Sequence, residues 1–197
     1  MALVSPLEES EIEKELCDFI QFFKGPLGVI PNSVRTMSRR PKIAKAFTDL
    51  NIAVMECHGK VTPEFKRIIG YVTSFVTGCR YCQAHTILGS QRFGSTDERL
   101  NDAWNFKESE HYNEAEKVAL EYANAAASVP NEVNEELAER LHAHWEDDDI
   151  VEITAVIALF GYLNRWNDSM GSALEDLPIE AGNKYLGNTD WTIGKHK

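Results

Sequence analysis

Residues 62–86 read TPEFKRIIGYVTSFVTGCRYCQAHT, and this stretch specifies two consecutive helices with a break between them. Its first three residues, Thr-Pro-Glu, are favoured at the N-cap, the first position and the first turn of a helix. Apolar residues then recur at helical spacing, namely Phe65, Ile68, Ile69, Val72, Phe75 and Val76. Gly78 is the residue type that ends a helix in the left-handed conformation. The sequence therefore predicts a first helix that ends at Gly78 and a second that opens at Cys79 and runs to about Phe93.

The same helical periodicity extends over the rest of the chain, while runs of alternating β-branched residues are nearly absent. Ser10 predicts the N-cap of a helix over 11–23, and Pro41 predicts the first turn of a helix that reaches about Cys57. Further helices are expected over 96–104, 113–127, 131–145 and 148–171. The last 25 residues are rich in Gly and Asn, so we expect them to be less regular and extended over the surface. No low-complexity linker divides the chain, and we predict one all-α domain over residues 1–197.

The chain also contains a weak internal repeat. A shift of 85 residues places Ile68, Phe75, Arg80 and Tyr81 on Ile153, Phe160, Arg165 and Trp166, and Cys79 and Cys82 on Asn164 and Asn167. Each copy has an acidic start, a long apolar helix and a polar-aromatic break. A true repeat predicts two related helical hairpins, over about 30–105 and 110–175, of which only the first carries thiols. The alternative is a chance match of a few residues.

The composition excludes several classes of partner. The chain carries a formal net charge of −11 and has a pI of about 5.0, so it offers no basic face for nucleic acid or for an anionic membrane. No apolar run approaches the ~20 residues needed to span a bilayer. Residues 1–16 lack the basic and apolar regions of a signal peptide. We therefore expect a cytoplasmic protein.

The four cysteines fall into two groups. Cys17 and Cys57 are isolated, and we interpret them as small apolar packing residues. Four cysteines in 197 residues are too few for a disulfide scaffold. Close pairing of Cys79 and Cys82 in a cytosolic chain indicates redox chemistry or metal binding instead.

The stretch CRYCQAH supplies the parts of an activated thiol. Cys79 and Cys82 are three residues apart and share one face of a helix. The positive end of the helix dipole favours thiolate over thiol. His85 lies one turn beyond Cys82 and is placed to take its proton. We favour a redox pair. The alternatives are two buried thiols, or a zinc site that needs a fourth ligand such as His58; we expect no metal and no cofactor.

Two stretches resemble a known family. PEFKRIIGYVTSFVTGCRYCQAHT at 63–86 resembles the AhpD-like alkylhydroperoxidase branch of the carboxymuconolactone decarboxylase family, and FGYLNRWNDSMGSALE at 160–175 looks like the second half of its peroxidase-related members. The resemblance covers roughly residues 30–175. It implies an all-helical fold of repeated hairpins and a homo-oligomer, either a trimer or hexamer as in the family or a dimer.

The resemblance also implies a mechanism. Cys82 would attack a hydroperoxide and become a sulfenic acid, and Cys79 would then form a disulfide with it. An external dithiol would reduce that disulfide by exchange. The substrate would be a hydroperoxide and the enzyme a thiol peroxidase.

The chain departs from the family pattern at two positions. The relay glutamate twelve residues before the first cysteine is replaced by Arg67, and the histidine four residues after the second cysteine is replaced by Thr86. His85 stands one position earlier, as in some peroxidase-related members. Arg67 would lower a thiol pKa rather than carry a proton. Glu152, in the equivalent position of the second repeat, and Glu116 are candidate replacements for the relay carboxylate; the alternative for each is an acidic residue in the first turn of a helix.

Two aromatic residues are candidates for substrate binding, Tyr81 between the cysteines and Trp166 in the polar cluster 164–168. That cluster is interpreted first as a structural network and second as pocket lining. Two other functions compete with the peroxidase. A decarboxylase-type lyase would not use the cysteine pair, whereas a non-enzymatic redox sensor would keep the thiols without turnover and is favoured by the missing relay glutamate.

Overall fold

The computed structural model describes residues 2–197, and within that range it contains helices and no strand. The α-helices are α1 (Lys14–Ile20), α2 (Lys24–Leu27), α3 (Asn32–Met37), α4 (Pro41–Met55), α5 (Pro63–Val76), α6 (Arg80–Arg92), α7 (Asp97–Asn101), α8 (Glu114–Ala127), α9 (Glu135–His142), α10 (Asp147–Met170) and α11 (Asp176–Tyr185). Short 3₁₀ helices occupy Glu9–Glu11, Gln21–Phe23, Ala103–Asn105 and Gly187–Thr189. The all-α prediction is confirmed.

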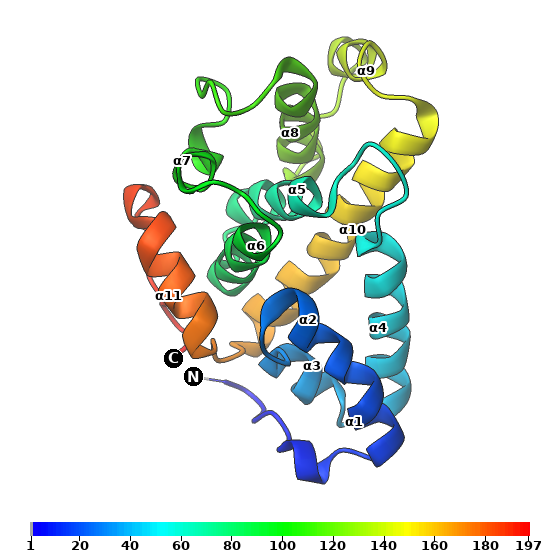
Figure 1. The fold of residues 1–197 in the computed structure, drawn as a ribbon, viewed down its shortest axis with the longest axis vertical. Helices are drawn as coiled ribbons and strands as arrows, with labels where there is room; N and C mark the ends of the chain where they lie inside the picture. Colours follow the sequence, from blue (N-terminus) through cyan, green and yellow to red (C-terminus); the bar gives the residue numbers. More distant parts are fainter. Residues whose placement is uncertain (1) are drawn as a thin grey trace.

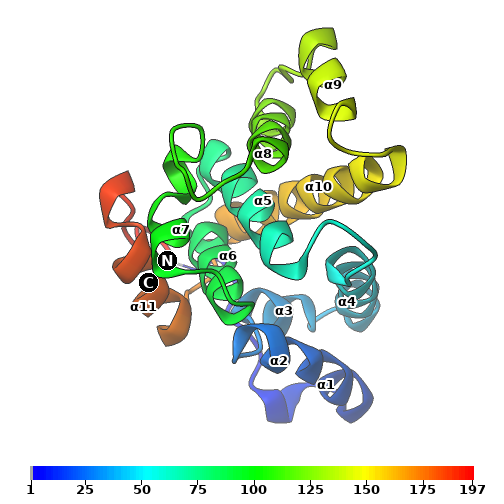
Figure 2. The same ribbon diagram turned by 45° about the horizontal axis from the view of Figure 1, so that its top comes forward.

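The hairpin of α5 and α6 forms the centre of the molecule (Figure 1). The long helix α10 packs against α5 and α6, and α8 covers the other side of α5. Helices α1–α4 lie together at one end, α8 and α9 lie at the other, and α11 packs along α6 (Figure 2). Within residues 2–197, no helix combines the length and the apolar character needed to cross a bilayer.

The break between α5 and α6 forms as the sequence predicts. Thr62 caps α5, its Oγ1 accepting the N–H of Phe65 at 3.1 Å, and Pro63 is the first helical residue. Gly78 takes the left-handed conformation, with φ of 76°, directly after the helix. Cys79 then caps α6, and its Sγ accepts the backbone N–H of Cys82 at 3.4 Å. Local chemistry therefore places both thiols at one helix N-terminus.

Helix α10 packs closely against α5 and is continuous where the internal repeat predicted a polar-aromatic break. A Cβ at Gly70 would overlap the Phe160 ring, so only glycine lets α10 lie this near. Helix α10 continues through 164–168 and ends only at Gly171. The residue equivalent to Gly78 is Leu163, which does not readily take the left-handed conformation. The helix predicted over 148–171 is therefore confirmed as α10, and the polar-aromatic break of the proposed repeat is absent from the second half.

Two terminal predictions also need correction. The predicted helix over 11–23 is divided, because Ile12 is extended between the first 3₁₀ helix and α1, and Ser10 lies inside that 3₁₀ helix rather than at an N-cap. The C-terminal region is not irregular throughout. Helix α11 forms within it and buries Pro178, Ala181 and Tyr185, which follow helical spacing.

Candidate active site

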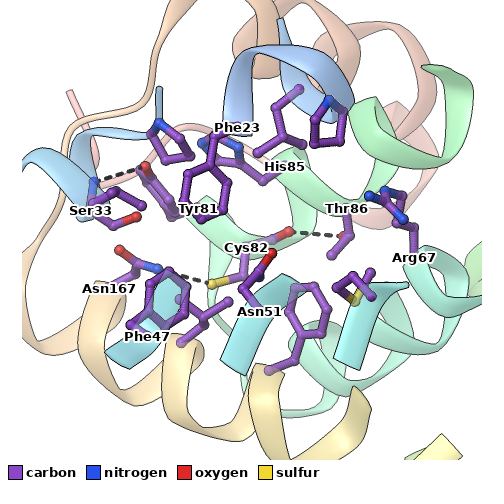
Figure 3. Close-up of a pocket in the computed structure, with 17 residues that line it drawn as sticks. Phe23, Ser33, Phe47, Asn51, Arg67, Tyr81, Cys82, His85, Thr86 and Asn167 are labelled. Carbon is purple, nitrogen blue, oxygen red and sulfur yellow. Dashed lines mark hydrogen bonds between the residues drawn. The ribbon is translucent and has the colours of Figure 1, made fainter. Parts of the chain in front are cut away.

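A cavity lies between α6, α10 and the N-terminal helices, and Cys82 is on its wall (Figure 3). Its lining residues are Phe23, Pro26, Leu27, Pro31, Ser33, Val34, Phe47, Asn51, Met55, Arg67, Tyr81, Cys82, His85, Thr86, Phe160, Leu163 and Asn167. The volume open to the centre of a water-sized sphere is about 70 Å³. One water needs about 10–15 Å³ on that measure, so the cavity has room for a small organic molecule.

The two thiols have different access to this cavity. Cys82 lines it, whereas Cys79 is buried and is not part of the lining. The Sγ of Cys79 lies 3.4 Å from the backbone nitrogen of Cys82, and both cysteines are free. On the other side, Nδ2 of Asn167 donates to Sγ of Cys82 at 3.4 Å. A substrate in the cavity can therefore reach Cys82, with Cys79 next to it.

Burial raises the pKa of the Cys82 thiol well above its ordinary value. The neighbouring Cys79 adds to this rise, and the amide of Asn167 acts in the opposite direction without cancelling it. Burial of Cys82 therefore opposes the thiolate that the helix N-terminus favours. Cys82 therefore needs a base close by.

His85 lines the same cavity as Cys82 and forms a largely buried pair with Glu175. Nε2 of His85 lies 2.7 Å from Oε2 of Glu175, and Nδ1 of His85 is buried without a hydrogen-bond partner among residues 2–197. Glu175 also accepts the Tyr81 hydroxyl at 3.1 Å and the backbone N–H of Asn32. When the imidazole is neutral, the charged carboxylate keeps its proton on Nε2, and Nδ1 is then the nitrogen that can accept a proton.

The pKa of Glu175 supports an ionised carboxylate. Burial acts to raise it, but the charge and hydrogen bond of His85 and the backbone N–H of Asn32 outweigh burial, and the net pKa is lowered. The carboxylate therefore stays ionised at neutral pH. An ionised Glu175 accepts a hydrogen bond from Nε2 and so fixes the orientation of the His85 ring.

Four predicted site residues line the same cavity: Arg67, Tyr81, Cys82 and His85. The Tyr81 ring lies 4.5 Å from the His85 ring, centroid to centroid, and its hydroxyl accepts the backbone N–H of Ser33 at 3.3 Å. Tyr81 therefore helps to orient His85 and Glu175, and it also forms part of the cavity wall.

Three predicted residues are placed elsewhere. Glu152 forms a buried ion pair with Lys66, and Glu116 caps α8 and pairs with Arg99 at 2.6 Å. Each carboxylate is therefore committed to a basic partner away from the thiol. Trp166 stacks on Tyr162, 6.2 Å between ring centroids, and it is Asn167 of the same cluster that reaches Cys82.

Glu175 was not predicted from the sequence. It is the last residue of the stretch 160–175 and the N-cap residue of α11, 90 residues from His85. No local spacing connects it to the cysteines. A correct prediction of α11 would have marked Glu175 as the acidic residue at a helix start, where carboxylates are favoured.

The described part of the chain, residues 2–197, contains no group of three His, Cys, Asp or Glu side chains placed to hold a metal ion. The fold and site thus define an AhpD-like helical protein with a Cys-X-X-Cys pair at a mostly apolar cavity.

Comparison with known proteins assigns the family. The sequence profile of the carboxymuconolactone decarboxylase family matches residues 41–125. YnjA of Escherichia coli (strain K12) is 36% identical over 103 residues, which make up 52% of this chain and 53% of YnjA. The matched region therefore spans about half the length of that relative. The chain belongs to the carboxymuconolactone decarboxylase family and has the AhpD-like fold.

Two solved structures extend the likeness over nearly the whole chain. The debrominase Bmp8 is 31% identical, with a TM-score of 0.87 over 93% of this chain and 97% of Bmp8. Its C82A variant has been solved in complex with 2,3,4-tribromopyrrole. A peroxidase-related protein from Ralstonia eutropha JMP134, with an alkylhydroperoxidase AhpD core, is 23% identical, with a TM-score of 0.77 over 90% of this chain and 96% of that protein. The second likeness shows a shared fold.

Proposed function

We propose that the protein is a thiol-dependent oxidoreductase that reduces small hydroperoxides through Cys79 and Cys82. The observation that carries the proposal is the placement of Cys82 on the wall of a mostly apolar cavity, with a proton acceptor on His85 and a second thiol adjacent. Peroxidase-related proteins of the same fold support the choice of substrate.

The first half of the reaction oxidises Cys82. Nδ1 of His85 takes the thiol proton, and the thiolate attacks the terminal oxygen of the hydroperoxide. The O–O bond breaks, an S–O bond forms, and the alkoxide takes the proton from His85 to leave as an alcohol. Cys82 is then a sulfenic acid.

The second half restores the thiols. The sulfur of Cys79 attacks the sulfur of Cys82, the S–O bond breaks, and hydroxide leaves and is protonated to water. An external dithiol then reduces the disulfide by exchange and becomes a disulfide itself. The balance is one hydroperoxide and one dithiol consumed, with one alcohol, one water and one external disulfide formed.

Reductive debromination is the second candidate, because Bmp8 is similar to this chain over almost its full length. In that reaction the Cys82 thiolate would attack bromine on an aromatic carbon. The C–Br bond would break, the carbon would take a proton, and an S–Br bond would form. Cys79 would then displace bromide and give the same disulfide.

The test is to treat the reduced protein with one equivalent of a small organic hydroperoxide and to map the thiols by peptide mass spectrometry. We expect a Cys79–Cys82 disulfide while Cys17 and Cys57 stay free. In Cys79→Ser the reaction should stop at a Cys82 sulfenic acid, which dimedone traps. Free thiols after hydroperoxide treatment would overturn the proposal. A disulfide formed only with bromopyrrole would favour debromination.

The remaining alternatives are separated by turnover. Continuous hydroperoxide consumption with a dithiol distinguishes an enzyme from a redox sensor, which would be oxidised once. A lyase would stay active when both Cys79 and Cys82 are replaced by serine. The homo-oligomer and the identity of the dithiol reductant stay predictions.

A further inference from the structure

Arg67 is a buried cation without a carboxylate partner. Its side chain is 7% exposed, and its Nη1 donates to the backbone oxygen of Pro63 at 2.7 Å. Its guanidinium carbon lies 4.0 Å from the centroid of the Phe93 ring. Among residues 2–197 no Asp or Glu lies within ion-pair distance of Arg67. One of its five N–H donors is therefore used by the protein, and the rest are available in the plane of the group.

Two other basic residues that are buried or partly buried, Lys66 and Arg99, have carboxylate partners. Lys66, the preceding residue, is fully buried and pairs with Glu152. Arg99 pairs with both Glu64 and Glu116, at 3.0 and 2.6 Å. Buried charges in proteins are paired, because an unpaired ion in a low-dielectric interior is costly. Arg67 departs from this rule.

Arg67 keeps its charge in this setting. Burial lowers its pKa to about 10, which still leaves the guanidinium protonated at neutral pH. The side chain is also held in place, since a Cβ at Gly89 would lie 2.7 Å from Cδ of Arg67. Glycine at this position of α6 makes room for the arginine, whose side chain packs directly against that helix.

The position of Arg67 relative to Cys82 would allow this charge to bind part of a substrate whose other end lies at the thiol. Both residues line the same cavity. Figure 3 shows Arg67 beside Thr86 at one end, Ser33 and Tyr81 at the other, and Cys82 between them. The walls between these polar ends are mostly apolar, with Phe23, Phe47 and Phe160 among them.

We infer that the cavity takes substrates that carry a carboxylate, which Arg67 binds while the reacting bond lies at Cys82. The carboxylate supplies the missing counter-charge and matches the planar donor geometry of guanidinium. This inference rests on the proposed function for the identity of the reacting bond, but the binding of the acid group is independent of it. The competing interpretation is that Arg67 is only a structural residue that stacks on Phe93 and bonds to Pro63.

Binding is tested first, without redox chemistry. The reduced wild-type protein is titrated with benzoate and, separately, with benzyl alcohol in a calorimeter. We expect benzoate to bind at least about 10-fold more tightly, the size of effect typical of a hydrogen bond to a charged group. Arg67→Gln should lower the benzoate affinity by about 10- to 100-fold and leave benzyl alcohol unchanged. Arg165→Gln removes an exposed arginine away from this cavity and should change neither affinity.

A second variant separates position from charge. Gly89→Ala keeps the arginine but displaces its side chain, so it should weaken benzoate binding as Arg67→Gln does. Equal binding of benzoate and benzyl alcohol, or full benzoate affinity in both variants, would overturn the inference.

Kinetics then link the acid group to the reaction. Cumene hydroperoxide and its para-carboxylate form a matched pair of substrates. Arg67→Gln should raise KM for the carboxylate by about 10-fold or more, with kcat and the neutral substrate little changed. Equal effects on both substrates would assign Arg67 a structural role and leave the peroxidase proposal intact. Arg67-dependent benzoate binding, with neither hydroperoxide oxidising Cys82, would overturn the peroxidase proposal and leave the ligand class standing.

Discussion

At the scale of single residues, the burial of Cys82 decides the chemistry of the site. The surroundings that exclude water also raise the pKa of the thiol, so that its reactivity depends on the groups in contact with it. His85 provides an acceptor nitrogen, and Glu175 fixes which nitrogen that is. The reactive unit that we propose is therefore three residues, Cys82, His85 and Glu175, acting with Cys79.

Glu175→Gln tests this unit. The amide cannot hold the proton on Nε2 by charge, and it can donate to Nε2 and so reverse the tautomer. We expect the oxidation of Cys82 to slow by roughly 10- to 100-fold, the usual effect of losing a group that orients an imidazole. Dimedone trapping in a Cys79→Ser background measures the rate. Glu180→Gln, an exposed residue of the same helix, is the control; an unchanged rate in Glu175→Gln would contradict the assignment.

The same residue predicts a pH dependence of stability. The pKa of Glu175 is lower in the folded protein than its ordinary value of 4.5, so the folded state binds fewer protons here than the unfolded state. Its contribution is therefore present above about pH 4.5 and is lost as the pH falls through the folded pKa. Urea denaturation from pH 7 to pH 3 should show the difference in free energy of unfolding between wild type and Glu175→Gln shrinking in acid. A difference that stays constant would mean that the carboxylate is not ionised in the fold.

The sequence predicted the residues that local spacing connects and missed those that only the fold brings together. Cys79, Cys82 and His85 lie within seven residues, and helix geometry alone places them on one face. Glu175 joins them from 90 residues away, through α11. Glu152 was proposed from an 85-residue shift, yet its carboxylate is occupied by Lys66.

At the scale of helices, the sequence predicted a boundary correctly where a single residue determines it. Thr62 determines the start of α5, and Gly78 determines its end. The polar cluster 164–168 lies inside the helix predicted over 148–171, and it forms hydrogen bonds to other helices, as the interpretation as a structural network expects. Asn164 accepts from Ser74 at 2.9 Å, and Asn167 donates to Cys82. A polar residue in an apolar helix can thus mark a contact to another helix, which sequence alone does not reveal.

The Lys66–Glu152 pair holds three helices together and gives an element-scale prediction. Nζ of Lys66 also donates to the backbone oxygens of Val54, at 2.7 Å, and Glu56 at the end of α4. Lys66→Met leaves a buried carboxylate unpaired and should lower the free energy of unfolding by about 3–5 kcal/mol in urea denaturation.

The matched variants decide between a structural and a catalytic role for Glu152. The double variant Lys66→Met with Glu152→Leu should recover much of the lost stability, since no unpaired charge remains. Glu152→Gln should lower stability but leave the oxidation rate of Cys82 unchanged at a temperature where the variant is folded. A slower rate there would restore Glu152 as a proton relay.

At the scale of the whole molecule, the site is assembled from segments that are distant in the chain. One buried cluster runs from Ile12 to Trp191. The first turn of α6, which carries both thiols, is covered by the C-terminal region: Nε1 of Trp191 donates to the backbone oxygen of Arg80 at 3.1 Å, and Nη1 of Arg80 donates to Oγ1 of Thr192 at 2.6 Å. The Trp191 ring packs directly on α11, where a Cβ at Gly182 would overlap it.

Trp191→Ala should therefore expose the cysteine pair. Loss of a buried tryptophan costs about 3–5 kcal/mol, and here it also removes the contact between the C-terminal region and the first turn of α6. We expect iodoacetamide to label Cys79 at least about 10-fold faster in the native variant, with the exposed Cys57 as internal reference. Trp104→Ala, at a 42% exposed tryptophan, should leave the rate unchanged.

Lys66→Met separates local from global opening, because it destabilises the protein without touching this region. Faster labelling in Trp191→Ala than in Lys66→Met would assign the C-terminal region as the cover of the thiols, and equal labelling would mean that they are reached only by global unfolding.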